Sequence, residues 1–405
     1  MKVLVLNCGS SSVKYQVFDM KNESVLAKGL AERIGLEGSR IVYQRGSEAK
    51  KVFEIPLPTH KKAIEEIFKL LVDKNNGVLQ SLNEIDAVGH RVVHGGDKFV
   101  ESVLVNDEVY SIFKGILDLA PLHNPYNLQG VDACSELMPG VPQVLVFDTS
   151  FHQTMPEEAY IYALPYEWYE KYKIRRYGFH GTSHYYVSRR VAELIGRPVE
   201  ELKIISCHLG NGASITAVRN GKSIDTSMGY TPLEGLVMGT RCGDIDPAIP
   251  ILLMEKENLT PKQIDEILNK KSGILGISGV SSDFRDVGEA AEKGNKRAEL
   301  ALKVFAYRVK KYIGAYYAIL GGLDVLVFTA GVGERGPLER SLICSGLEHL
   351  GIKLDPEKNK VKGEELRISA PDSKVEVWVI PTNEELMIAR ETVRVVGEKI
   401  IKKVI

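Results

Sequence analysis

The 405-residue sequence predicts an α/β fold, and three of its features support this prediction. Several short apolar runs, such as residues 144–148, end in polar or glycine residues, as strands do when a ligand lies at their ends. Longer stretches carry apolar residues at the three- and four-residue spacing of helices. Two similar strand–turn–strand patterns lie far apart in the chain. At roughly 150 residues per domain, the length predicts two or three domains.

The elements can be placed in chain order. Apolar residues 3–6 predict a first strand, Gly9–Ser12 predicts a turn, and alternating residues 13–19 predict a second strand. Further strands are expected in the runs 144–148, 203–212, 325–334 and 375–385. Helices are expected at 59–74, with Thr59 as N-cap, at 299–320 and at 384–403.

The opening strand–turn–strand pattern recurs at residues 204–222. Each copy has an apolar strand, a turn of Gly, Ser or Asn, and a second strand. A duplicated domain with one phosphate-facing loop in each half explains this recurrence, and so do two unrelated β-hairpins. The pattern alone does not decide between them.

Composition excludes several classes of protein. Hydrophobic residues make up 44% and charged residues 26%, as in soluble globular proteins. The formal net charge of -1 gives no electrostatic argument for nucleic acid or an anionic membrane as partner. The five cysteines are scattered without a C-x-x-C pair, so neither a disulfide framework nor a zinc site is expected. The apolar runs are too short for a signal peptide or a membrane span, so we expect a soluble, cytoplasmic protein.

Two segments near the start combine small residues with positive charge. Residues 7–14 offer backbone N–H groups, serine hydroxyls and Lys14 to an anion, although a serine-rich hairpin turn has the same composition. Residues 89–96 hold two histidines, three glycines and Arg91, whose planar fork suits carboxylate or phosphate. A strand with one buried histidine explains only part of this second cluster.

The middle of the chain adds three candidates. Asp148 ends an apolar run and can orient an arginine, hold the water shell of Mg²⁺ or cap a helix. Residues 175–184 concentrate arginine and histidine around two glycines, which favours a functional site over a solvated loop. Residues 208–214, including Leu209 and Gly210, form a turn suited to a nucleotide phosphate or an ordinary hairpin.

Three later segments complete the pattern. Residues 238–247 place an arginine and two carboxylates among glycines, as a surface turn also does. Residues 328–334, with Val332 and Gly333, suit a nucleoside but lack the spacing of a dinucleotide fingerprint. Glu384 and Glu385 either cap a helix or bind a metal. Together, glycines, arginines, histidines and carboxylates at strand ends favour a polyanion bound with a divalent metal.

Several of these segments resemble the acetate and propionate kinase family. LNCGSSSVKYQVFD (6–19) and VGHRVVHGG (88–96) are similar to its two signature segments. FDTSFHQTMP, RRYGFHGTSH, HLGNGAS, MGTRCGDIDP, SGVSSDFRDV, FTAGVGE and PTNEE match further family blocks in the same order, over essentially the whole chain. The resemblance implies two similar domains of a duplicated actin-like, ribonuclease H-like fold that flank a nucleotide cleft. Their expected extents are residues 1–148 with the helix 385–405, and residues 149–384.

The resemblance also implies an activity. Such a kinase transfers the γ-phosphoryl group of ATP reversibly and in line to acetate, giving acetyl phosphate and ADP. A propionate or other short-chain acyl kinase is the alternative, and an actin- or Hsp70-like conformational ATPase is a rival from another class. The implied cofactor is Mg²⁺, with Mn²⁺ as a substitute. The implied assembly is a homodimer without nucleic acid or membrane partners.

Residue by residue, the family pattern assigns roles to positions of this chain. The catalytic centre is assigned to Arg91, Asp148, His180 and Arg241. The acetate methyl group is assigned to an apolar pocket of Val93, Leu122, Phe179 and Pro232. The phosphates are assigned to His208, Asn211 and Gly212, adenosine to Asp283, Phe284, Arg285 and Gly331, and Mg²⁺ to Asn7 and Glu384. The chain departs from the family at Arg335, where asparagine is usual.

Overall fold

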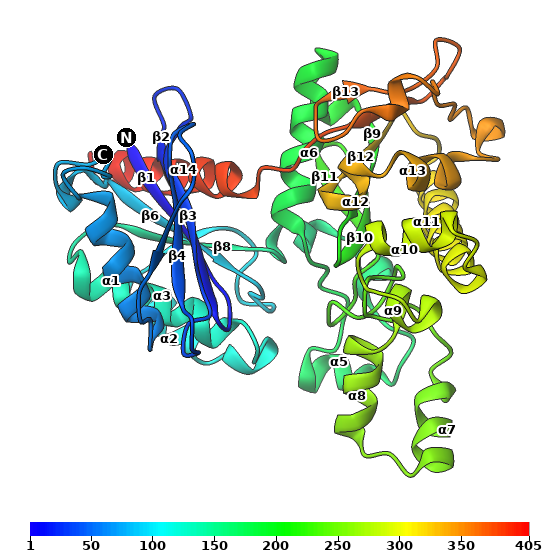
Figure 1. Cartoon of the computed structure of the whole chain (residues 1–405), viewed down its shortest axis with the longest axis horizontal. Coiled ribbons are helices and arrows are strands. Elements are labelled where there is room, and N and C mark those ends of the chain that lie inside the picture. The colour runs from blue at the N-terminus through cyan, green and yellow to red at the C-terminus, as the bar shows by residue number, and fades with distance from the viewer. Residues whose placement is uncertain (405) are drawn as a thin grey trace. The chain divides into compact units, whose positions relative to one another are not determined.

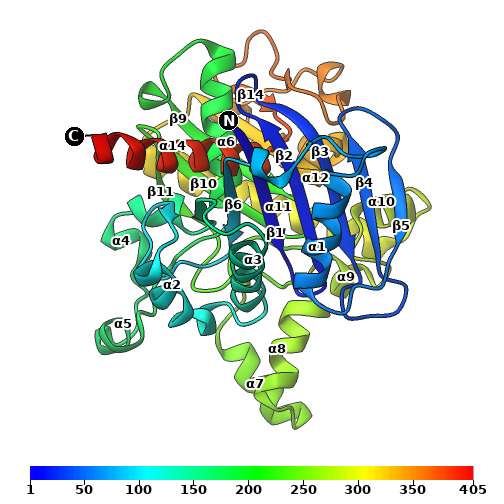
Figure 2. The same cartoon turned by 90° about the vertical axis from the view of Figure 1, so that its left-hand side faces the viewer.

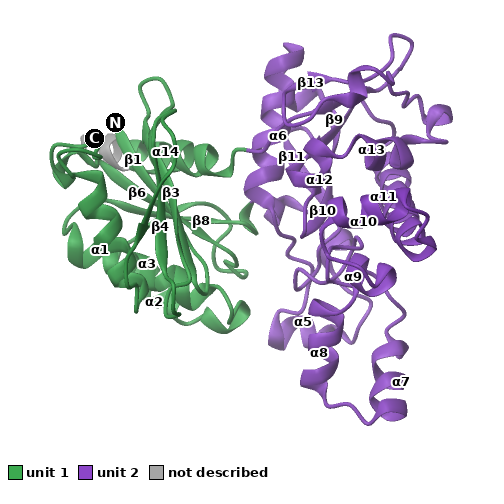
Figure 3. Ribbon diagram, viewed as in Figure 1, with its two compact units in different colours: residues 1–150, 383–405 green, residues 151–382 purple. Residues whose placement is uncertain are grey.

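The structure is a computed structural model that describes the backbone of residues 1–404 and the side chains of residues 1–398. The chain forms two compact units (Figure 3). Unit 1 comprises Met1–Ser150 and Asn383–Ile405, and unit 2 comprises Phe151–Thr382. The domain extents given above, 1–148 with 385–405 and 149–384, stay a prediction, and residue 405 lies outside the described residues.

Unit 1 is built on an eight-stranded sheet with the order β5-β4-β3-β2-β1-β6-β8-β7 (Figures 1 and 2). Strands β1, β2 and β3 pair antiparallel, whereas β6 and β8 run parallel to β1. The carboxyl ends of β1, β6 and β8 therefore meet at one edge. The strands are β1 Lys2–Cys8, β2 Ser12–Asp19, β3 Ser24–Glu32, β4 Arg40–Arg45, β5 Lys51–Glu54, β6 Ala87–Val92, β7 Val103–Leu104 and β8 Gln143–Phe147.

Helices cover both faces of this sheet. Gly89 of β6 faces α14, because an added Cβ would meet Ile388 and Thr392. His90, the next residue, points to the opposite face, where Gly130 of α3 lies. The helices are α1 His60–Leu71, α2 Asp107–Lys114, α3 Asn124–Leu137 and α14 Glu384–Val404, with short 3-10 helices at Leu82–Glu84 and Leu117–Leu119. Thr59 caps α1 as predicted, since its hydroxyl accepts a hydrogen bond from the Lys62 N–H at 3.1 Å.

Unit 2 is built on a six-stranded sheet with the order β11-β10-β9-β12-β14-β13. Its strands are β9 Lys203–Leu209, β10 Ala213–Arg219, β11 Lys222–Thr226, β12 Val325–Thr329, β13 Leu366–Arg367 and β14 Glu376–Val379. Its α-helices are α4 Glu157–Tyr160, α5 Tyr166–Tyr172, α6 Gly181–Ile195, α7 Ala248–Glu257, α8 Pro261–Lys270, α9 Gly273–Ser278, α10 Phe284–Glu292, α11 Lys296–Leu320, α12 Ala330–Arg335 and α13 Pro337–Cys344. Short 3-10 helices lie at Ser150–Thr154, Val199–Glu201, Glu348–Leu350 and Lys358–Lys360.

The two sheets share a five-stranded core. In unit 1 the order β3-β2-β1-β6-β8 combines two antiparallel and two parallel pairings, and β11-β10-β9-β12-β14 repeats the same order and directions in unit 2. The hairpins β1–β2 and β9–β10 each pair over seven residues. Of the two explanations for the repeated pattern, the shared topology favours duplication. The prediction of two similar α/β domains is confirmed.

Several expected elements differ from the structure at their ends. The strands expected in the runs 203–212 and 375–385 end at Leu209 and Val379. The predicted strand 325–334 ends at Thr329, and residues 330–335 form the helix α12 instead. The helix expected at 299–320 begins earlier, at Lys296, because the Asn295 side chain accepts a hydrogen bond from the Ala298 N–H. No helix in the described part of the chain combines the length and the apolar character needed to cross a bilayer.

Candidate active site

The first group of predicted residues lies at the carboxyl edge of the sheet in unit 1. Arg91, near the end of β6, donates from Nη2 to Asp148 Oδ2 at 2.5 Å and from Nε to Asp148 Oδ1 at 3.3 Å. Asp148 directly follows β8, and its side chain is 2% exposed. Arg91 Nη1 also reaches Asn7 Oδ1 at 3.5 Å. The structure thus pairs Asp148 with an arginine, while the roles of Asp148 in catalysis and near Mg²⁺ stay a prediction.

Glu384 stands beside this ion pair at the start of α14. The helix is capped by Asn383, whose Oδ1 accepts a hydrogen bond from the Leu386 N–H at 3.1 Å, so Glu384 is not the capping residue. Glu384 Oε1 is buried without a hydrogen-bond partner among the side chains that the structure describes. Burial raises the pKa of Glu384, although the Arg91 charge opposes the rise. A buried carboxylate oxygen without a donor is a suitable ligand for a cation.

Other predicted residues of unit 1 have different surroundings. Lys14 forms an ion pair with Glu385, so its charge is already partly offset. His90 is the buried histidine of a strand, held by Gln143 at 2.7 Å, and burial lowers its pKa to about 4. Val93 is buried, whereas Leu122 is 68% exposed.

In unit 2, Arg241 and His180 converge on Gly212 in the turn between β9 and β10. A Cβ atom added to Gly212 would lie 3.5 Å from both Arg241 Nη1 and His180 Nε2. Arg241 Nη1 donates to the Pro232 carbonyl at 3.3 Å and lies 3.7 Å from Met238 Sδ. Burial lowers the pKa of Arg241, and within the described residues no carboxylate is paired with it. An arginine without an acidic partner beside a glycine turn is suited to an anionic ligand.

A chain of hydrogen bonds fixes His180 at the start of α6. His180 has a left-handed backbone, with φ of 55°, and its Nδ1 lies 2.8 Å from Ser214 Oγ. The same hydroxyl lies 2.8 Å from Nε2 of the buried His184. The His180 ring stacks on His208 with a centroid distance of 4.1 Å. These contacts come from α6, β9 and β10, and they hold the imidazole next to the Gly212 turn.

A cavity of about 420 Å³ within unit 2 adjoins this turn. Asp283, which caps α10, lies on its wall, and a fork from Arg285 lowers the pKa of Asp283 to about 2. Among the predicted nucleotide residues, the lining includes Gly210, Asn211, Asp283, Phe284, Arg285, Gly331 and Val332. Leu209 and Gly333 are buried outside this lining.

Three residues of the cavity wall, Ser282, Gly336 and Glu339, are not among the residues predicted from the sequence. Arg335, which departs from the family pattern, also lines the cavity. Glu339 is 8% exposed, and burial raises the pKa of its carboxyl group. It occupies the first turn of α13, a common position for acidic residues, so nothing in the sequence distinguishes it from a helix-stabilising group. Of the apolar pocket assigned to acetate, Phe179 is buried and Pro232 partly buried in unit 2.

Comparison with known proteins identifies the family. A sequence model of the acetokinase family matches residues 2–390. The acetate kinase of Dictyoglomus turgidum is 99% identical over 405 residues and all of both chains, and that of Caldanaerobacter subterraneus subsp. tengcongensis is 64% identical over 99% of both. The crystal structure of Porphyromonas gingivalis acetate kinase superposes with a TM-score of 0.94 at 52% identity, covering 98% of this chain and 99% of that one. A Francisella tularensis propionate kinase gives 0.90 at 45% identity over 97% and 99%. The chain belongs to the acetokinase family.

Proposed function

We propose that this protein transfers the γ-phosphoryl group of ATP reversibly to acetate, giving acetyl phosphate and ADP. Membership of the acetokinase family and curated relatives named acetate kinase support this activity. The structural observation that carries the proposal is the Arg241–His180 pair at the Gly212 turn, next to a cavity lined by the predicted nucleotide residues. A propionate kinase among the similar structures keeps propionate as the second candidate acceptor.

The chemistry requires positive charge rather than a general base. A simple carboxylic acid has a pKa near ~4, so the acceptor is ionised at neutral pH and no proton needs to be removed. Its approach to a phosphoryl group brings two anions together, and phosphoryl transfer depends on positioning and on charge stabilisation. We assign this stabilisation to Arg91, Arg241 and His180. In this proposal Asp148 orients Arg91.

The cavity of unit 2 is assigned to the nucleotide. The backbone N–H groups of the glycine-containing turn 210–212 can approach the phosphates closely, because glycine places no side chain in the way. The residues from Asp283 to Arg285 and Gly331 then surround adenosine. We place the phosphoryl end of ATP near Gly212, since that is where Arg241 and His180 meet.

The acetate methyl group is assigned to Val93, Leu122, Phe179 and Pro232. One methylene group more or less in an apolar pocket changes the free energy of binding by ~1–3 kcal/mol. Propionate should therefore be a poorer but measurable substrate, and butyrate a worse one.

We propose Mg²⁺, with Mn²⁺ as a substitute, as the metal, held by the Asn7 amide and Glu384. The buried Glu384 Oε1, which has no hydrogen-bond partner among the described side chains, fits this assignment. Among the side chains described, no cluster of three or more histidine, cysteine or acidic residues is present, so water and phosphate oxygens would supply the other ligands. The bound metal would offset phosphate charge during transfer. A homodimer in the cytoplasm completes the proposal.

Trapping of the acyl phosphate tests this function. The purified protein is incubated with ATP, Mg²⁺, hydroxylamine and one acceptor, and the hydroxamate is measured. We expect hydroxamate with acetate, less with propionate and little with butyrate. Equal ATP hydrolysis with and without acetate, and no hydroxamate, would indicate a conformational ATPase instead.

A further inference from the structure

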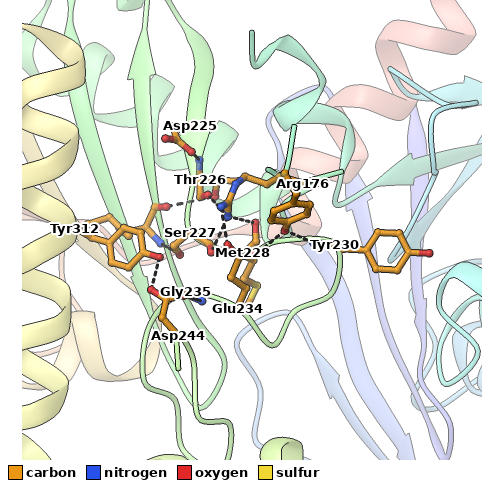
Figure 4. Close-up of polar contacts among 12 residues, drawn as sticks. Arg176, Asp225, Thr226, Ser227, Met228, Tyr230, Glu234, Gly235, Asp244 and Tyr312 are labelled. Carbon is orange, nitrogen blue, oxygen red and sulfur yellow. Dashed lines mark hydrogen bonds and ion pairs between the residues drawn. The ribbon is translucent and has the colours of Figure 1, made fainter. Parts of the chain in front are cut away.

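Arg176 lies within unit 2 and is absent from the residues assigned to the reaction. Its side chain is 16% exposed, and Nη2 donates to Glu234 Oε1 at 2.7 Å. Nη1 lies 3.0, 3.1 and 3.2 Å from three successive carbonyl oxygens, those of Thr226, Ser227 and Met228 (Figure 4). One guanidinium group therefore joins both ends of the segment 226–234, here called the 226–234 loop.

A tyrosine reinforces this connection. Tyr162 donates from its hydroxyl group to Glu234 Oε2, and the same hydroxyl accepts a hydrogen bond from the Tyr230 N–H at 2.9 Å. The packing leaves no room at Gly229, where an added Cβ would lie 1.8 Å from Glu234 Oε2 and 2.2 Å from the Tyr162 hydroxyl. The conformation of the 226–234 loop is thus tightly defined around the Arg176–Glu234 pair.

A second anchor holds the chain just beyond the loop. Gly235 donates from its N–H to Asp244 Oδ1 at 2.8 Å, and Tyr312 donates to Asp244 Oδ2 at 2.7 Å (Figure 4). Because the residues on both sides are fixed, the carbonyl group of Pro232 in the middle of the loop has a defined position. That carbonyl accepts the 3.3 Å hydrogen bond from Arg241 Nη1.

Backbone hydrogen bonds of the two residues after Arg176 also hold the loop against the segment that leads to His180. The N–H groups of Tyr177 and Gly178 donate to the Gly229 carbonyl at 3.1 and 3.2 Å. Phe179 comes next in the chain. These hydrogen bonds therefore connect the segment next to Phe179 with the 226–234 loop, which carries Pro232. Both Phe179 and Pro232 are assigned to the acetate pocket.

We infer that Arg176 is a positioning residue for the carboxylate substrate. By closing the 226–234 loop, it places the Pro232 carbonyl that orients Arg241, and it sets the spacing between Pro232 and Phe179. The inference rests on the proposed function, because it assigns Arg241 to the reacting anions. Arginine is required since lysine, a point charge, cannot hold Glu234 and a row of carbonyl groups at once.

The test compares Arg176→Lys with wild type in steady-state kinetics for acetate, propionate and ATP. We expect kcat/KM for acetate to fall about 10²-fold, because a misplacement of about 1 Å has an effect of that size. The ratio of propionate to acetate should change, whereas the KM for ATP should stay within about twofold, because Arg176 is not part of the nucleotide cavity. Arg190→Lys is the control, since it disrupts a two-pronged ion pair with Glu365 elsewhere in unit 2.

A double variant separates positioning from general stability. If Arg176 acts mainly through Arg241, Arg176→Lys adds little further loss in the Arg241→Ala background. Should Arg176→Lys not fold, Tyr162→Phe provides a milder change that should move the acetate kinetics in the same direction. A folded variant with acetate KM and acyl preference within about twofold of wild type would overturn the inference. A wild-type protein without acetate-dependent ADP formation would instead refute the proposed function.

Discussion

Replacing Arg91 should destabilise the protein more than replacing Arg241, although both arginines should be required for turnover. Arg91→Ala removes one ion-pair partner of Asp148, whose carboxylate is 2% exposed and receives two hydrogen bonds from this arginine. Removing one member of a buried ion pair costs about 3–5 kcal/mol of unfolding free energy. Arg241→Ala removes one long hydrogen bond to Pro232 and a sulfur contact, a loss of about 0.5–1.5 kcal/mol.

Urea unfolding followed by circular dichroism measures the loss of unfolding free energy in each variant, and a coupled assay of ADP formation measures turnover. Turnover should fall by about 10³- to 10⁵-fold in both variants, the range for an arginine that offsets charge in phosphoryl transfer. The double variant Arg91→Ala, Asp148→Ala should recover much of the lost stability but no turnover, because the buried carboxylate that lost its arginine is also removed while the cation is still missing. Arg190→Ala is the control, since its partly exposed ion pair contributes at most about 1 kcal/mol.

Two results would refute this reasoning. Wild-type stability of Arg91→Ala would show that the ion pair with Asp148 does not hold the fold as its geometry indicates. Turnover near that of wild type in either single variant would remove that arginine from the reaction.

Three further changes test the cavity, the acetate pocket and a buried acid. A Cβ atom added at Gly331 meets no atom of the described residues within 4 Å, so Gly331→Ala should not destabilise α12. It should raise the KM for ATP about tenfold, because the new methyl group crowds the nucleotide. Gly314→Ala in α11, which also meets no atom within 4 Å among the described residues, is the control and should leave this KM unchanged. Leu122→Ala truncates an exposed side chain, so the unfolding free energy should change by less than about 0.5 kcal/mol while kcat/KM for propionate rises relative to acetate. Burial raises the pKa of Asp225 from 3.8 to about 6, so the folded state holds its proton more tightly and this group's stabilising contribution is lost as pH rises through that window. The free energy of unfolding of Asp225→Asn, measured with urea, should therefore exceed that of wild type by up to about 3 kcal/mol at pH 7.5 and by less at pH 5. A stability gain that does not depend on pH would contradict the raised pKa of Asp225.

The sequence predicted the parts of the fold whose signals are local. Apolar runs and turn residues place β1, β2, β8, β9 and β12, and three- and four-residue spacing places α1 and α11. The position of Asp148, a polar residue directly after an apolar run, made it a candidate site residue from the sequence alone. Its pairing with Arg91 required the parallel register of β6 and β8, which is set by sheet order and not by either segment alone.

The nucleotide cavity shows what a single sequence cannot supply. Asp283 and Gly331 both line the cavity although they are distant in the chain, because packing in unit 2 brings their segments to it. Glu339 carried no signal because acidic residues in a first helical turn are common. The sequence shows that the segment 175–184 is rich in cations, but the hydrogen bonds from Arg176 to the 226–234 loop depend on tertiary packing.

In the reaction that we propose, the cations of this protein allow a carboxylate to take the γ-phosphoryl group of ATP. Phosphorus-31 NMR of the protein with ATP, Mg²⁺ and acetate observes every phosphorus species directly. We expect an acetyl phosphate resonance that grows as the γ-phosphate signal falls, and no such resonance with Arg241→Ala. ADP and inorganic phosphate as the only new species, formed at the same rate without acetate, would contradict this expectation.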